Sequence, residues 1–156
     1  MIKRIIALLL AIALVFLAYQ WLDRLTQAHT RSPRRSCANN LKQLGLAVIM
    51  WRGDHTNALP RNWSKMARYI GHHSNLLVCP DSGHEPGDIA TATQWSDYRL
   101  VTNPAPLAED EAVLAYCSPT NHDDKGASVV FLDGHVEWLN VDECRTVLQK
   151  QNLTMR

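Results

Sequence analysis

Residues 31–60 decide the fold; they begin Arg-Ser-Pro-Arg-Arg-Ser-Cys-Ala-Asn-Asn-Leu-Lys-Gln-Leu-Gly-Leu-Ala. From the cysteine onward, apolar side chains recur at alternating intervals of four and three residues, which places them on one face of a helix. The members of this stripe are Cys37, Leu41, Leu44, Val48 and Trp51. Gly45 lowers helix stability by about 1 kcal/mol relative to alanine, so its presence favours close packing against a strand. The stretch predicts a helix over 36–52 that packs along one side.

An apolar run precedes this helix. Residues 5–22 carry no charge, and their eighteen positions just reach the length that spans about 30 Å of hydrocarbon. Tyr19 and Trp21 stand where interfacial aromatic residues belong. No small-residue cleavage site follows Leu22 promptly, which favours an uncleaved anchor over a removed signal peptide. We therefore expect a membrane anchor over 1–30, with Ile5, Leu9, Phe16 and Trp21 as its packing residues.

Two indications of topology conflict. Lys3 and Arg4 precede the apolar run, whereas Arg24, Arg31 and a pair at 34–35 follow it, so the count of basic residues favours a cytoplasmic carboxyl-terminal domain. An even number of cysteines fits an oxidising compartment instead. These are Cys37, Cys79, Cys117 and Cys144, which allow three disulfide pairings. The residues alone leave both the orientation and the pairing open.

Length and charge limit the class of protein. A chain of 156 residues accommodates an anchor and one globular domain, here 31–156. Lys+Arg 16 against Asp+Glu 15 is almost neutral, which argues against a nucleic-acid-binding surface. The one basic cluster, Arg31, Arg34 and Arg35, is interpreted as a flank that contacts lipid headgroups.

The clearest local signal is a hairpin over 128–139. Asp133-Gly134 lies between two β-rich runs, and this dipeptide is typical of a two-residue type I′ turn. Such a turn pairs Phe131 with Val136 and Val129 with Trp138. All four side chains would then share one face of a sheet.

Other segments are assigned from shorter patterns. Ser32-Pro33 predicts a kink or a new helix start, since proline disrupts a helix interior. Asn62 caps a short helix over the following residues. Residues 98–101 and 112–116 are expected to be strands, and 79–93 a loop. Asn140 and Glu143 predict a capped terminal helix.

Histidines and cysteines raise the question of a metal site. The candidate ligands are His72, His73, Cys79, His84, His122 and His135. Structural zinc sites usually show two ligand pairs at short spacing, whereas here Cys79 and His84 form the nearest pair and have no counterpart. We therefore predict no metal site and no cofactor. The alternative function is a membrane-tethered extracytoplasmic metal-binding module that uses histidine and cysteine ligands.

The sequence signals for other kinds of site are weaker still. Asp123, Asp124 and Asp133 are candidates for a loose oxygen site, but the EF-hand pattern fails and a solvated turn explains them. A nucleophile group of Cys117 with His122 and Asp133 has no spacing rule behind it. Gly-x-Ser-x-Gly and glycine-rich phosphate loops are absent from the sequence. The chain is predicted not to be an enzyme.

Two stretches carry a family resemblance. Arg34-Arg35-Ser36-Cys37-x-Asn39-Asn40-Leu41-Lys42-Gln43-Leu44-Gly45-Leu46-Ala47 is followed by His55, Pro60 and Cys79-Pro80. Asn121-His122 and Phe131-Leu132-Asp133-Gly134-His135-Val136 follow in the same order. On these residues the chain resembles type IV pilin-like, pseudopilin-related proteins of the planctomycete–verrucomicrobial type. About a third of the chain takes part in the match.

The resemblance implies an α+β fold in which a long amino-terminal transmembrane spine helix packs on a small antiparallel sheet. It also implies a single-pass protein of the cytoplasmic (inner) membrane with an extracytoplasmic head and a structural or secretion-associated, non-catalytic role. Implied partners are membrane lipid, further copies of the chain, and secretion or pilus machinery. Typical members carry a glycine-ended leader followed by Phe-Thr-Leu-Ile-Glu, which this sequence lacks.

Overall fold

The structure, a computed structural model, describes the backbone of residues 2–154 and the side chains of residues 4, 6, 9–22 and 33–154. Its contacts divide the chain into two units, Met1–Ser32 and Pro33–Arg156. Helix α1, Ile2–Asp54, begins in the first unit, and every other element belongs to the second. The helix assignment continues through Pro33, so the predicted restart at Ser32 does not occur.

The predicted transmembrane anchor is contradicted. Among the residues that the structure describes, no helix has both the length and the apolar character that crossing a bilayer requires. Leu9, Phe16 and Trp21 are exposed, and the side chain of Ile5 lies outside the described residues. The predictions of a transmembrane pilin-like fold and of an inner-membrane location are therefore wrong.

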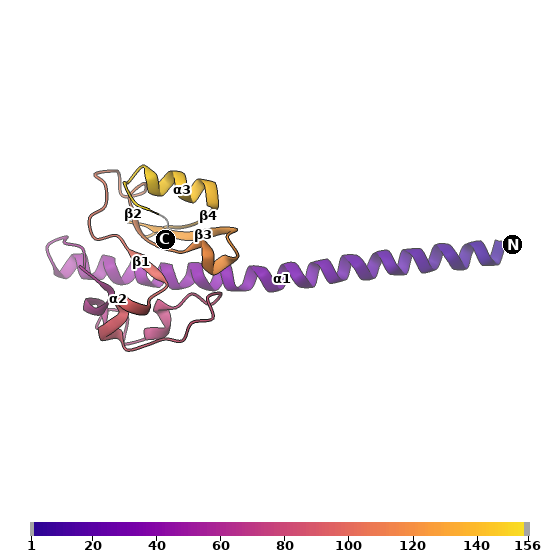
Figure 1. The fold of residues 1–156 in the computed structure, drawn as a ribbon, viewed down its shortest axis with the longest axis horizontal. Helices are drawn as coiled ribbons and strands as arrows, with labels where there is room; N and C mark the ends of the chain where they lie inside the picture. Colours follow the sequence, from indigo (N-terminus) through magenta and orange to yellow (C-terminus); the bar gives the residue numbers. More distant parts are fainter. Residues whose placement is uncertain (1, 155–156) are drawn as a thin grey trace. The chain divides into compact units, whose positions relative to one another are not determined.

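The second unit is an α+β domain built on one antiparallel sheet (Figure 1). Its strands follow one another in chain order: β1 (Tyr98–Leu100), β2 (Val113–Cys117), β3 (Gly126–Phe131) and β4 (Val136–Asn140). Two helices accompany them, α2 (Ala92–Trp95) and α3 (Val141–Gln149). Short 3-10 turns fill the connections: η1 (Trp63–Met66), η2 (Ser74–Leu77), η3 (Ile89–Thr91) and η4 (Pro119–His122).

The end of α1 packs on the sheet through the predicted stripe. Cys37, Leu41, Leu44 and Val48 are fully buried, and Trp51 is half-buried against the same core. Gly45 allows the helix to approach β3 closely, because a Cβ at this position would lie 2.8 Å from Cγ2 of Val130. Close packing at this glycine, expected from the sequence, is thus confirmed.

Strand β3 is the centre of the core and is covered on both faces. Val129 and Val130 point to opposite faces, as neighbours on a strand do, and both are fully buried. Val130 contacts the α1 side, while α3 packs on β3 and β4 from the other side (Figure 1). Helix α3 begins with the predicted capping box of Asn140 and Glu143.

The hairpin forms where the sequence predicts it, but with a different turn. Val130 pairs with Val136 and Ser128 pairs with Trp138, which shifts the predicted register by one residue. Gly134 has a positive φ of 86°, whereas Asp133 does not, so the turn is not type I′. Hydrogen bonds from Gly134 N to Phe131 O and from Phe131 N to His135 O close a longer loop with the glycine as a bulge. Val136 and Trp138 consequently lie on the sheet face opposite to Val129 and Phe131.

Candidate metal centre

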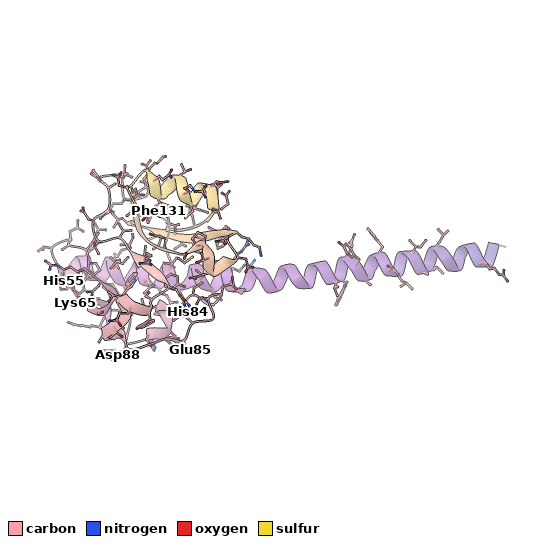
Figure 2. All side chains as sticks on the ribbon, viewed as in Figure 1. His55, Lys65, His84, Glu85, Asp88 and Phe131 are labelled. Carbon is pink, nitrogen blue, oxygen red and sulfur yellow. The ribbon has the colours of Figure 1, made fainter. Side chains whose placement is uncertain are left out.

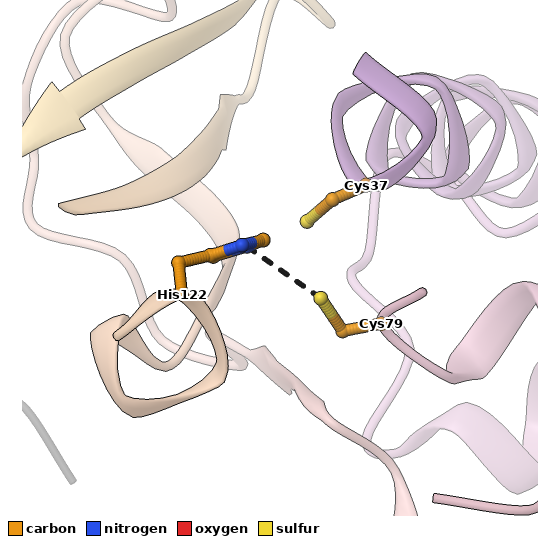
Figure 3. A group of neighbouring side chains, drawn as sticks. All are labelled: Cys37, Cys79 and His122. Atoms are coloured by element: carbon orange, nitrogen blue, oxygen red, sulfur yellow. Dashed lines mark hydrogen bonds between the residues drawn. The ribbon is translucent and has the colours of Figure 1, made fainter. Parts of the chain in front are cut away.

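Three metal-ligating side chains meet in the core of the second unit. Cys37 comes from α1, Cys79 from the loop after η2, and His122 from the end of η4, and all three point toward one another (Figure 3). Their ligand atoms lie within 4.8 Å of one another. The exposed fractions are 0% for Cys37, 1% for Cys79 and 2% for His122. The group is therefore closed off from solvent.

Cys79 is held by a carboxylate beneath its loop. Asp97 Oδ2 accepts hydrogen bonds from the backbone N of Cys79 at 2.8 Å and from Ser82 Oγ at 2.6 Å. The other oxygen, Oδ1, lies 2.7 Å from His84 Nδ1. On the α1 side, Asn40 Nδ2 donates to the backbone O of Val78 at 3.1 Å. Cys79 is thereby fixed both to the loop and to the helix that carries Cys37.

His122 is oriented by its two ring nitrogens. Nε2 lies 3.5 Å from Cys79 Sγ, while Nδ1 donates to Asp81 Oδ2 at 2.8 Å. A histidine that ligates a metal through one nitrogen usually donates its other N–H to a carboxylate or carbonyl, which fixes the ring and its tautomer. Asp81 occupies this supporting position, and its side chain is 37% exposed while that of His122 is 1% exposed.

An aromatic layer covers the imidazole. Trp138 of β4 lies edge-on to His122 with ring centroids 5.0 Å apart, and the guanidinium carbon of Arg34 stands 4.4 Å above the Trp138 ring. The cation and the indole attract each other through the ring quadrupole. Trp138 therefore separates the histidine from water on this side.

The environment shifts the protonation of the cluster. Burial lowers the pKa of His122, but hydrogen bonds to Cys37, Cys79 and Asp81 outweigh it and raise that pKa to about 10. The pKa of Cys79 is raised by its contact with the Cys37 thiol and by burial. Both shifts favour the protonated forms of these two side chains. A metal ion would displace these protons, because thiolate and neutral imidazole are the forms that ligate.

The donor set and its spacing fit a zinc ion. Zinc lies about 2.3 Å from thiolate sulfur and about 2.0–2.1 Å from imidazole nitrogen, so two such ligands at a tetrahedral angle are about 3.6 Å apart. The observed Cys79 Sγ to His122 Nε2 distance is 3.5 Å. Among the described histidine, cysteine and acidic residues, three supply ligand atoms to this cluster: two thiol sulfurs and one imidazole nitrogen. Structural zinc sites almost always have four protein ligands, whereas three protein ligands with water in the fourth position are the arrangement of catalytic sites, so this cluster supplies one ligand fewer than a structural site usually has.

A nucleophilic role fits the same residues less well. Cys79, His122 and Asp81 stand in the order nucleophile, base and orienting carboxylate. A nucleophile needs access to substrate, yet a cleft of about 540 Å³ near His84 and Arg99 is not lined by Cys79 or His122. Two smaller clefts of about 360 and 160 Å³ do not reach these residues either. Burial and the raised pKa of the thiol also disfavour a reactive Cys79.

The other residues considered from the sequence lie elsewhere. His72 and His73 are exposed, His84 (labelled in Figure 2) pairs with Asp97, and His135 pairs with Asp133. Asp123 pairs with Lys125 at 2.9 Å, which favours the solvated turn over a cation site. Cys117 accepts a hydrogen bond from Ser128 N and is not a member of the cluster. All four cysteines are free thiols, so none of the three disulfide pairings occurs.

Cys79 and His122 are among the candidate ligands identified from the sequence, whereas Cys37 is identified there as a packing residue and a possible disulfide partner. Cys37 lies on α1, far in sequence from Cys79 and His122, so no local spacing indicated that the three residues meet. Comparisons with protein-family models, curated proteins and solved structures found no match. Membership of the pilin-like family accordingly stays a proposal.

Proposed function

We propose that the protein binds one zinc ion through Cys37, Cys79 and His122, and that the ion has a structural role. The observation that carries this proposal is the buried cluster of two thiols and one imidazole, with Asp81 on the far nitrogen of that imidazole. Two thiolates would neutralise a divalent cation, which matters because an unpaired charge is costly in a closed site. Zinc accepts this mixture of sulfur and nitrogen ligands.

The ion would join three segments that are distant in sequence. Cys37 lies on α1, Cys79 on the loop that Asp97 organises, and His122 on η4. A metal that binds only the folded chain stabilises it by mass action. The distance of the cluster from the three clefts favours stabilisation over catalysis.

Zinc titration of the full chain against a chromophoric chelator tests the proposal. We expect one zinc per chain in the wild type and loss of this binding in Cys37→Ser and Cys79→Ser. Cys144→Ser is the matched control, because Cys144 is also fully buried but belongs to no metal-ligating group among the described residues. Equal affinity in Cys79→Ser and the wild type would contradict the proposal, as would the absence of stoichiometric zinc.

A second candidate function is a structural subunit that associates with further copies through α1, as the pilin-like resemblance implies. It is favoured by the exposed apolar side chains between Leu9 and Leu22, which include Val15 at 70% and Trp21 at 70% exposure. Apolar surface of this extent marks an interaction site in most proteins. Sedimentation velocity would reveal concentration-dependent association that Phe16→Glu removes and Leu107→Glu leaves intact. A monomer at all concentrations would contradict it.

A further inference from the structure

Two of the three proposed ligands are thiols that also have a reaction available with each other. Cys37 Sγ and Cys79 Sγ belong to one group within 4.8 Å, and Figure 3 shows both side chains directed into the same space. The hydrogen bond with Cys37 is the largest cause of the raised pKa of the Cys79 thiol. In contrast, Cys117 and Cys144 are buried without a second cysteine in such a group among the described residues. Cys37 and Cys79 are therefore the two cysteines that share a metal-ligating group among the described residues.

We infer that Cys37 and Cys79 form a metal-or-disulfide pair, in which zinc binding and disulfide formation exclude each other. The inference rests on the proposed zinc site and assigns its regulation. A thiolate that ligates zinc has its lone pair engaged and is a poorer nucleophile toward an oxidant. A sulfur bonded to its partner sulfur has lost the thiolate that zinc requires.

The reaction balances with a peroxide as oxidant. The attack requires the open form of the Cys79 loop, because burial and the raised pKa keep Cys79 a neutral thiol in the closed fold. In the open form the Cys79 thiolate attacks one oxygen of hydrogen peroxide, the O–O bond breaks, and Cys79 becomes a sulfenic acid while hydroxide leaves. The Cys37 sulfur then attacks the Cys79 sulfur, the S–O bond breaks and water leaves. In sum, two thiols and one peroxide give one disulfide and two waters. The thiols lose two electrons, which the peroxide takes up.

Access to the pair requires that the loop of Cys79 opens, which breaks the hydrogen bonds of Cys79 N to Asp97 and of Asn40 Nδ2 to Val78 O. Cys37 lies on the continuous helix α1, whereas residues 79–88 contain no regular helix or strand. Asp81 in this loop is partly exposed, and Gly83 has a positive φ of 70° and open space around it. Opening of such a segment costs less than global unfolding. The loop would thus admit peroxide to Cys79, and zinc would hold it shut.

The test compares apo and zinc-loaded full-length protein during treatment with hydrogen peroxide, followed by alkylation in denaturant and peptide mapping. In the apo protein we expect a single disulfide between Cys37 and Cys79, while Cys117 and Cys144 remain alkylated. At free zinc 100-fold above its Kd, only about 1% of the chains are metal-free, so the oxidation should slow about 100-fold. A disulfide at another pair, no disulfide, or equal rates with and without zinc would overturn the inference.

Two variants separate this inference from the zinc proposal. His122→Ala removes a ligand and keeps both thiols, so its disulfide should form at the same rate with or without zinc. His122→Gln serves the same purpose if the alanine variant fails to fold. Zinc content is measured in every sample. Zinc that binds the wild type without slowing its oxidation overturns only the inference, whereas absent zinc binding overturns the proposed function and the exclusion with it.

Discussion

Two histidine–aspartate pairs of almost equal length lie in very different surroundings. His122 Nδ1 is 2.8 Å from Asp81, and His135 Nδ1 is 2.6 Å from Asp133. The side chain of His122 is 1% exposed, whereas that of His135 is 36% exposed. His122 also faces two thiols, whereas His135 stacks on Phe131 at the hairpin turn. Hydrogen-bond length alone does not distinguish a ligand-orienting pair from a turn contact.

The two pairs differ in the sequence separation of their partners. Asp133 and His135 are two residues apart, and the backbone N of His135 also donates to the Asp133 carboxylate. This backbone bond lowers the pKa of Asp133. Asp81 and His122 are 41 residues apart and meet only in the folded domain. The first pair is a property of a turn, and the second is a property of the whole domain.

Removal of His122 should therefore change the zinc-dependent stability far more than removal of His135. This is the largest difference that we predict. With free zinc at 100 times its Kd, the wild type should gain about 2.7 kcal/mol in the free energy of unfolding. His122→Ala should lose this gain completely, and His135→Ala should retain it. Urea unfolding with zinc and with a chelator measures both. A zinc-dependent gain in His122→Ala equal to that of the wild type would contradict the account.

The two carboxylates extend the contrast at a smaller magnitude. Loss of an outer carboxylate typically weakens metal affinity about 10–100-fold, which is the effect expected for Asp81→Ala. Asp81→Asn should recover part of the loss, because its amide oxygen still accepts from Nδ1 of His122. Asp133→Ala should leave zinc affinity within about twofold, although it removes a turn contact. Competition titration with a zinc chelator measures these affinities. A wild-type zinc affinity in Asp81→Ala would show that Asp81 does not orient His122 as a ligand.

Stability against pH should depend on the buried pair. The folded pKa of His122 is about 10, above its ordinary value of 6.5. The stabilisation from its protonated form is therefore complete below about pH 6.5 and is lost as the pH rises toward 10, by up to about 1.4 kcal/mol per pH unit. Urea unfolding of the apo protein in a chelator should show this fall in the wild type and in His135→Ala. A free energy of unfolding that does not change between about pH 6.5 and pH 10 would contradict this prediction.

The smallest effect concerns the helix that carries Cys37. A methyl group at Gly45 meets Val130 at 2.8 Å, so Gly45→Ala should lower the free energy of unfolding by about 1 kcal/mol despite its better helix propensity. Gly53 has open space, and Gly53→Ala should stabilise by up to about 1 kcal/mol. Equal gains at both positions would mean that close packing of α1 on β3 does not position Cys37.

Local patterns in the sequence locate most elements of the second unit. The stripe from Cys37 to Val48, the capping box at Asn140 and the close approach at Gly45 all follow from short-range rules. The hairpin turn did not, because Asp133-Gly134 suits both a type I′ turn and a turn with a glycine bulge. The proposed zinc ligands do not follow from such rules either, since Cys79 and His122 are 43 residues apart and Cys37 lies within a helix. Only the fold brings them together.

X-ray absorption at the zinc edge, on full-length protein with one equivalent of zinc, tests the central claim most directly. The account predicts two sulfur neighbours at about 2.3 Å and nitrogen or oxygen neighbours at about 2.0–2.1 Å, with one sulfur lost in Cys37→Ser. A first shell made only of nitrogen and oxygen, or a spectrum unchanged by Cys37→Ser, would contradict it.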